Sequence, residues 1–175
     1  MVRRKHIRTL VEKLLKSQNI RSEPVRVKSL AKNLGIQVQE QTAEDGLSGF
    51  LYRDRNRNLT IIGVNVDHHE NRQNFTAAHE LGHFFLHDFD QVHFDRSFKV
   101  WRRDEKSSDG TNLEEREANL FAAELLMPAK FLEESINELG SLEFEADEIK
   151  QLAKRYEVSV EAMTIRLTSL GYLDS

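Results

Sequence analysis

Residues 79–83 read His-Glu-Leu-Gly-His, with two histidines four positions apart and a glutamate directly after the first. Positions i and i+4 of a helix lie on the same side, so His79 and His83 can bind one metal ion together. Neutral imidazole is a common zinc ligand. Glu80 lies roughly 100° further round the helix, where it can accept a proton from a water molecule on that ion. The pattern predicts a zinc-dependent hydrolase with Glu80 as the general base.

The neighbouring residues favour a metal site over a chance occurrence of this short pattern on a surface helix. An apolar face at helical spacing is formed by Phe, Ala, Gly, Phe and Leu at positions 75, 78, 82, 85 and 86. His79 and His83 lie at the margin of that face, and Glu80 lies just beyond it, towards an expected cleft. Because Gly82 has no side chain, a neighbouring helix or strand can approach closely there.

A hydrolytic zinc site needs a third protein ligand and an open fourth position. A second predicted helix, 112–127, carries Glu115 on an apolar face that also presents Ala118 and Ala122. An unpaired carboxylate on such a face is very unfavourable, and a metal ion would satisfy it. Glu115 is therefore the predicted third ligand. The alternative is a capping box between Glu115 and Asn112.

Other polar residues of the same helix have different predicted roles. Glu114 fits a capping box with Thr111, and Glu117 is expected to point to solvent. Asn119 shares the face of Glu115 one turn later, where its amide can orient a ligand imidazole.

Two histidines are alternatives to this assignment. His87 lies on the helix of His79, but ligands spread along that helix would span about 12 Å, too far for one ion, so a polar helix end or a lid is favoured. His93 is expected on the surface or in a loop, from which it can swing into the site. The residue that stabilises the oxyanion is left open among Tyr52, His93 and Tyr156.

Two long motifs carry a resemblance to a known family. Residues 75–83, and then residues 115–128 with the sequence Glu-Arg-Glu-Ala-Asn-Leu-Phe-Ala-Ala-Glu-Leu-Leu-Met-Pro, resemble the ImmA/IrrE family of metallopeptidases. Shorter similarities occur at 47–50, at 62–65 and between 158 and 171. The resemblance implies that His79, His83 and Glu115 are zinc ligands and that Glu80 is the catalytic residue.

The resemblance also implies a partner, because known members of that family act on helix-turn-helix repressors in mobile-element or stress-response circuits. The expected function is a zinc-dependent endopeptidase that cleaves such a repressor. The alternative is a non-catalytic, zinc-stabilised anti-repressor that acts by binding its partner.

The hydrophobic periodicity predicts helices and a hairpin that would position these residues. A β-hairpin is expected over 47–66, with a turn at 54–58, and would supply an edge strand above the cleft, where an extended peptide can bind. Residues 36–39 are expected to be extended, and 88–110 to form a loop. Helices are predicted at 6–17, 27–34, 67–87, 112–127, 128–139, 145–155 and 159–170.

Together these elements predict an α+β fold, a zincin-like metallopeptidase domain with a small mixed sheet and a helical C-terminal extension. Three segments are expected. Residues 1–40 form a basic helical segment packed on the core, residues 41–139 form the metallopeptidase core, and residues 141–175 form a helical segment resembling a helix-turn-helix.

The cysteine content, hydropathy and charge of the chain limit the kinds of site and the location that it can have. The chain contains no cysteine, which excludes disulfides and thiolate metal sites, and it has no apolar run long enough for a membrane span. A cytoplasmic location is expected. Residues 1–32 hold ten Lys or Arg against two Glu, whereas the whole chain has a net charge of −4. This basic segment lacks the interleaved aromatic residues that would favour nucleic-acid binding. We therefore interpret it as a solvated helix face.

Overall fold

The computed structural model describes residues 1–43, 46–88, 91–95, 110–140 and 145–174 of the chain. In chain order, its elements are α1 (Arg4–Ser17), α2 (Val27–Asn33), β1 (Gln37–Gln41), β2 (Gly49–Asp54), β3 (Leu59–Asn65), α3 (Glu70–Leu86), β4 (Gln91–Asp95), α4 (Gly110–Leu126), α5 (Ala129–Leu139), α6 (Ala146–Arg155) and α7 (Val160–Leu170). Helices and one small mixed sheet confirm the predicted α+β class.

The four strands form a sheet in the order β1-β3-β2-β4, in which only the β1–β3 pair is parallel. Strands β2 and β3 form the predicted hairpin. Its turn is closed by Asp54, whose Oδ1 accepts the backbone N–H groups of Asn56 and Arg57 at 3.0 and 3.1 Å. Both hairpin strands have neighbours on each side, so the expectation that this hairpin supplies the edge strand is wrong. Among the described strands, β1 and β4 are at the edges.

Strand β4 lies in the segment that was expected to be a loop, so that expectation is wrong for residues 91–95. The strand pairs antiparallel with β2, from Gly49 opposite Asp95 to Arg53 opposite Gln91. A strand this short has little periodicity of its own, and main-chain hydrogen bonds to β2 hold it in place. Residues 89–90 and 96–109 of the expected loop lie outside the described residues, and Gly110 is already the first residue of α4.

Helix α3 begins three residues later than predicted. Asp67, the first residue of the predicted helix, instead donates its backbone N–H to Oδ1 of Asn65 at 3.0 Å, in the turn that follows β3. His69 is the N-cap, and its Nδ1 accepts the backbone N–H of Asn71 at 3.2 Å. The helix therefore starts at Glu70, and it ends at Leu86, one residue before the predicted end.

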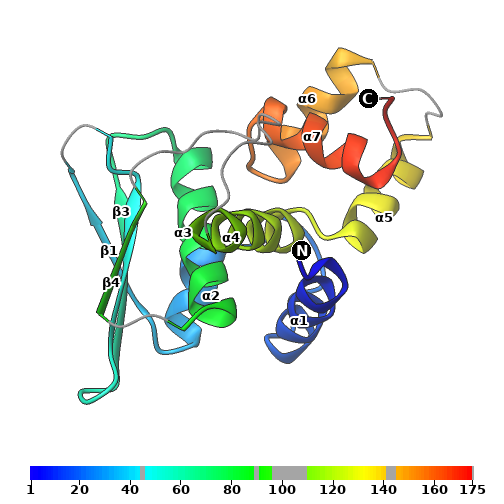
Figure 1. Cartoon of the computed structure of the whole chain (residues 1–175). Coiled ribbons are helices and arrows are strands. Elements are labelled where there is room, and N and C mark those ends of the chain that lie inside the picture. The colour runs from blue at the N-terminus through cyan, green and yellow to red at the C-terminus, as the bar shows by residue number, and fades with distance from the viewer. Residues whose placement is uncertain (44–45, 89–90, 96–109, 141–144, 175) are drawn as a thin grey trace.

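Figure 1 shows α3 between the sheet and α4, and residues 76–83 of this helix are all buried. Two glycines make this close packing possible. A Cβ on Gly49 of β2 would lie 2.4 Å from Cγ2 of Thr76, and a Cβ on Gly82 would lie 2.9 Å from Cα of Ala118. The predicted close approach at Gly82 is thus confirmed, and the partner is α4.

Helices α1 and α7 both contact α4. Helix α1 packs against it with a buried face of Ile7, Val11, Leu14 and Leu15. In α7, Arg166 is 3% exposed, and its guanidinium donates to both carboxylate oxygens of Glu124 on α4 at 3.0 and 2.7 Å. Within the part of the chain that the structure describes, we find no helix long and apolar enough to cross a bilayer. The division into three segments stays a prediction.

Candidate metal centre

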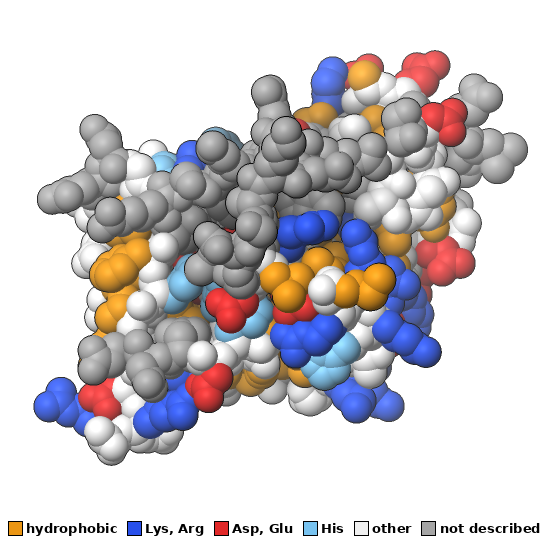
Figure 2. All heavy atoms as spheres, in the orientation of Figure 1, with side chains coloured by type: hydrophobic (Ala, Val, Ile, Leu, Met, Phe, Trp, Pro, Cys, Tyr) orange, Lys and Arg blue, Asp and Glu red, His pale blue; other side chains and the backbone are white. Residues whose placement is uncertain are grey.

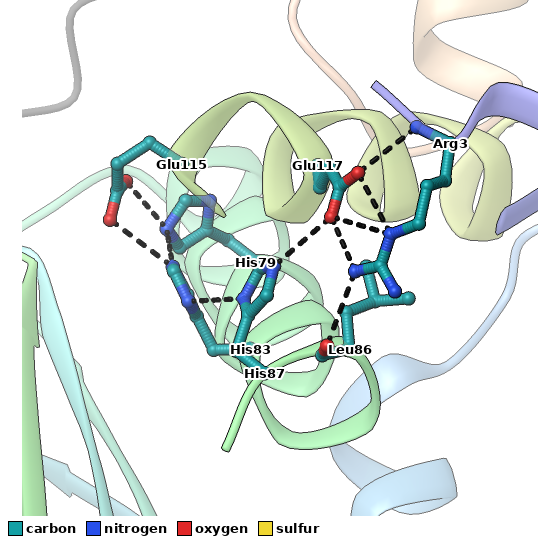
Figure 3. A network of polar contacts seen from close by, with 7 residues as sticks. All are labelled: Arg3, His79, His83, Leu86, His87, Glu115 and Glu117. Atoms are coloured by element: carbon teal, nitrogen blue, oxygen red, sulfur yellow. Dashed lines mark hydrogen bonds and ion pairs between the residues drawn. The ribbon is translucent and has the colours of Figure 1, made fainter. Parts of the chain in front are cut away.

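Side chains of α3 and α4 converge beside the sheet. The ligand atoms of His79, His83 and Glu115 all lie within 4.8 Å of one another. The Nε2 atoms of His79 and His83 are each 3.3 Å from a different oxygen of Glu115, and 3.0 Å from each other (Figure 3). The two imidazoles are buried, whereas the Glu115 side chain is 39% exposed. Glu115 is therefore less buried than the apolar face of its helix predicts, but the structure does bring the three predicted ligands together.

A residue of α4 orients the first imidazole. Asn119 accepts a hydrogen bond from His79 through Oδ1, 2.9 Å from Nδ1. Because an amide oxygen can only accept, Nδ1 of His79 carries the proton and Nε2 keeps its lone pair. That lone pair lies on the side of Glu115. The contact expected between Asn119 and a ligand imidazole is thus present.

The protonation states in this cluster suit metal binding. Burial lowers the pKa of His83 to about 4, against the opposing effect of its hydrogen bond to Glu115. Burial raises the pKa of Glu115, but hydrogen bonds from His79, His83 and His93 outweigh it and hold that pKa well below its usual range. A neutral imidazole and an ionised carboxylate are the forms that bind a metal ion.

This set of donors fits a zinc ion. Two imidazole nitrogens and one carboxylate oxygen are a known ligand set of catalytic zinc sites, which keep a fourth position for water or substrate. The lone pair assigned to His79 and both oxygens of Glu115 point into one small space, where a bound cation would relieve their mutual repulsion.

Glu80 follows His79 directly and is fully buried. Its carboxylate lies under β2, where a Cβ on Gly49 would be 3.8 Å from Oε1. Its Oε2 is 3.5 Å from Nδ1 of His93. The predicted general base therefore lies beside the three candidate ligands, on the side nearer the sheet.

His93 of β4 belongs to the same cluster. Its Nε2 is 3.0 Å from Oε1 of Glu115, and its ring centroid is 3.8 Å from that of His83. Burial lowers the pKa of His93, but the hydrogen bonds and charges of Glu115 and Glu80 outweigh it and raise that pKa to about 10. The expectation that His93 is a surface or loop residue is wrong, because strand β4 holds it beside Glu80 and Glu115. The alternation Val-His-Phe at 92–94 is consistent with a strand, but it is too short to predict one from the sequence alone.

The two tyrosines considered as oxyanion-stabilising groups lie elsewhere. Leu51 is the register partner of His93 and Tyr52 is that of Val92. Since successive residues of a strand point to opposite faces, Tyr52 and His93 lie on opposite faces of the sheet. Tyr156 is buried at the end of α6, where its hydroxyl is 2.9 Å from Oγ of Ser135.

His87 and Glu117 form a second polar cluster behind the first. Nδ1 of His87 is 3.0 Å from Nδ1 of His83, and its Nε2 is 3.3 Å from Oε2 of Glu117. His87 is not part of the candidate ligand group. Glu117 is 2% exposed, so the expectation that it points to solvent is wrong. It pairs with Arg3, whose hydrogen bonds lower the pKa of Glu117 to about 2.

The space-filling view shows histidine and acidic side chains at the surface between the sheet and α4, with Lys and Arg side chains gathered over α1 (Figure 2). A cavity of about 910 Å³ lies on another side of α4, lined by residues that include Phe75, Ala162 and Ile165. Asn119 borders this cavity as well, but none of the three candidate ligands does.

Comparison with known proteins gives a family match over a range that contains the three candidate ligands. A peptidase family described as the IrrE N-terminal-like domain matches residues 31–168. Among solved structures, a Mycobacterium tuberculosis transcriptional regulator is similar in fold, with a TM-score of 0.64 and 18% sequence identity. The similarity covers 95% of this chain and 48% of that one, so this chain spans about half the length of the regulator. A search of curated proteins gives no match.

Proposed function

Because this chain belongs to the peptidase family of the IrrE N-terminal-like domain, we propose that it is a zinc-dependent endopeptidase. The observation that carries the proposal is the position of a fully buried carboxylate, Glu80, beside the convergent group His79, His83 and Glu115. A protein that only binds a partner has no use for a base at that position.

His79, His83 and Glu115 would hold the ion, which leaves the fourth position for water and substrate. Bound Zn²⁺ lowers the pKa of water and polarises a substrate carbonyl. Glu80 accepts the proton from the attacking water and passes it to the leaving amine, the two roles of one general acid–base residue. Its burial keeps bulk water away from this carboxylate.

His93 is the residue best placed to stabilise the oxyanion. Its ring lies between Glu80 and Glu115, with one nitrogen near each carboxylate, and it is the only one of the three candidates on the site's face of the sheet. An imidazole N–H directed at the carbonyl oxygen would stabilise the negative charge that develops there. When Glu115 binds the ion, Nε2 of His93 becomes available for that contact.

The sheet supports an extended polypeptide as the substrate. Strand β4 is an edge strand, and in the described part of the chain no strand pairs with its outer side. An extended polypeptide can add to such an edge through main-chain hydrogen bonds. Because His93 lies in the middle of β4, a segment bound there would pass the metal group. The resemblance to the ImmA/IrrE family supports a helix-turn-helix repressor as this polypeptide.

The test is to co-express candidate repressors with the wild type and with Glu80→Gln, and to identify shortened proteins by mass spectrometry. Glu80→Gln should retain one zinc per chain and lose cleavage by at least about a hundredfold, because the general base is removed. If the repressor is inactivated by both forms but shortened by neither, the protein acts by binding. Equal cleavage by both forms would exclude Glu80 as the base.

A further inference from the structure

A continuous line of polar contacts joins the segment before α1 to His83 (Figure 3). The guanidinium of Arg3 donates from Nε and Nη2 to the carboxylate of Glu117, with Nη2 2.5 Å from Oε2, and its backbone N–H donates to Oε1 at 3.0 Å. Glu117 in turn lies 3.3 Å from Nε2 of His87, and Nδ1 of His87 lies 3.0 Å from Nδ1 of His83.

Three of these four side chains are buried, so each of the three needs its neighbour in the line as a hydrogen-bond or charge partner. The side chains of His83, His87 and Glu117 are at most 5% exposed, whereas that of Arg3 is 48% exposed. A carboxylate as buried as that of Glu117 is very unfavourable unless a cation pairs with it. Arg3 supplies this charge and also donates from Nη2 to the carbonyl oxygen of Leu86, at the end of α3, at 3.3 Å.

The chemistry of the groups fixes the direction of the hydrogen bonds. An ionised carboxylate only accepts, so Nε2 of His87 donates to Glu117. A neutral imidazole that donates from one nitrogen accepts at the other, so His83 donates from Nδ1 to Nδ1 of His87. His83 then keeps the lone pair on Nε2, the nitrogen that faces Glu115 and His79.

We propose that Arg3, Glu117 and His87 are positioning residues, which together set the tautomer and the ring orientation of His83 for metal binding. The inference rests on the proposed metal site and extends it, because Arg3 belongs to a segment outside the two metal-binding helices. Hydrogen-bond partners of metal ligands commonly change metal affinity by about 10- to 100-fold when they are removed.

A second ion pair of the same kind provides a matched control. Arg8 of α1 is 51% exposed and lies 3.4 Å from Glu124 of α4, which is 5% exposed. This pair also joins the N-terminal segment to α4, but the other partner of Glu124 is Arg166, on α7. Loss of Arg8 therefore weakens the same helix packing and leaves His83 untouched.

The decisive measurements are zinc affinity, by competition with a chromophoric chelator, and histidine tautomers in the metal-free protein, by ¹⁵N NMR of the imidazole rings. Arg3→Ala and Glu117→Leu should each weaken zinc binding about 10- to 100-fold. They should also shift His83 away from the tautomer protonated at Nδ1. Leucine fills the buried space of Glu117, and the half-exposed Arg3 can then turn to water. Arg8→Ala should match the wild type in both measurements.

Several outcomes would overturn the proposal. If Arg3→Ala and Glu117→Leu bind zinc like the wild type with unchanged tautomers, the line of contacts is only structural. The same conclusion follows if Arg8→Ala weakens zinc binding equally. If Glu117→Leu does not fold, Arg3→Ala alone decides. Failure of the proposed metal site is distinguishable, because the wild type would then bind no more zinc than His79→Ala.

Discussion

Oδ1 of Asn119 lies 2.9 Å from Nδ1 of His79, so a residue of α4 fixes the tautomer of an imidazole carried by α3. Asn119→Ala should therefore weaken zinc affinity by about tenfold or more, because the ring loses its orienting acceptor. Isothermal titration of the metal-free protein measures this. Asn71→Ala, which removes an amide bonded to the carbonyl oxygen of Val158, is the control and should bind zinc like the wild type. Equal affinities in all three would contradict the assigned role.

Glu115→Gln tests the third ligand. Glutamine is a helix former comparable to glutamate, so α4 should persist, but a neutral amide is a poor zinc ligand and affinity should fall strongly. Because a ligand that binds only the native state stabilises it by mass action, a chelator should lower the Tm of the wild type far more than that of Glu115→Gln. Glu114→Gln, at the exposed neighbouring position, should behave like the wild type. A zinc titration of Glu115→Gln that matches the wild type would remove Glu115 from the site.

His93→Gln tests the oxyanion assignment. Loss of one donor to a developing oxyanion commonly costs about 10²- to 10³-fold in kcat. We expect that loss with one zinc still bound per chain, measured on a purified peptide substrate. Tyr52→Phe and Tyr156→Phe should keep wild-type kcat, because those hydroxyls lie away from the metal group. A large loss of kcat in Tyr52→Phe, with His93→Gln active, would reverse the assignment.

Gly82→Ala tests the close packing of α3 on α4. The added methyl group would lie 2.9 Å from Cα of Ala118, which is backbone and cannot rotate away. Overpacking of this kind costs about 1–3 kcal/mol, partly offset by the better helix propensity of alanine, about 1 kcal/mol. Zinc affinity should also fall, since α4 carries Glu115 and must move. Urea unfolding and zinc titration give the two values, and a variant with wild-type values for both would show that α4 is not held at this contact.

Tyr156→Phe should change how stability depends on pH. Burial raises the pKa of Tyr156, with the hydrogen bond to Ser135 acting in the opposite direction. The neutral form is thus favoured in the folded state. This contribution is fully present below the unfolded pKa of about 10 and is lost as the pH rises through the higher folded pKa. Wild-type stability should fall more steeply above pH 10 than that of Tyr156→Phe.

Urea unfolding between pH 8 and pH 11 checks this difference in slope. At pH 8 the variant should be less stable by about 1 kcal/mol, the usual value of a lost hydrogen bond. Parallel pH profiles for the wild type and Tyr156→Phe would refute the prediction.

The features that the sequence predicts well depend on the periodicity of single helices. His79 and His83 share a side of α3 because of their spacing, and Glu115 and Asn119 share a side of α4 for the same reason. The close approach at Gly82 is predicted equally well, since only the absence of a side chain is needed.

The features that the sequence does not predict depend on partners far away in the chain. Glu117 looks like a solvent-facing residue of its own helix, but the charge of Arg3, 114 positions earlier, makes its burial favourable. Likewise β4 is too short to be recognised alone, and its pairing with β2 places His93 beside the metal group. For Glu115 the prediction errs in the other direction. The apolar face of its helix predicts a buried side chain, whereas that side chain is 39% exposed.

The candidate ligands come from two helices, and about thirty residues separate His83 from Glu115. A metal ion bound by both would close a loop of that length, as a covalent cross-link does. In the chain-entropy treatment of cross-links, such a closure restricts the unfolded chain by about 3–4 kcal/mol. A backbone cut between residues 95 and 110 would fall inside the loop. The ion would then join two separate fragments. Without the ion, packing contacts such as that of Gly82 against Ala118 would have to hold the fragments together.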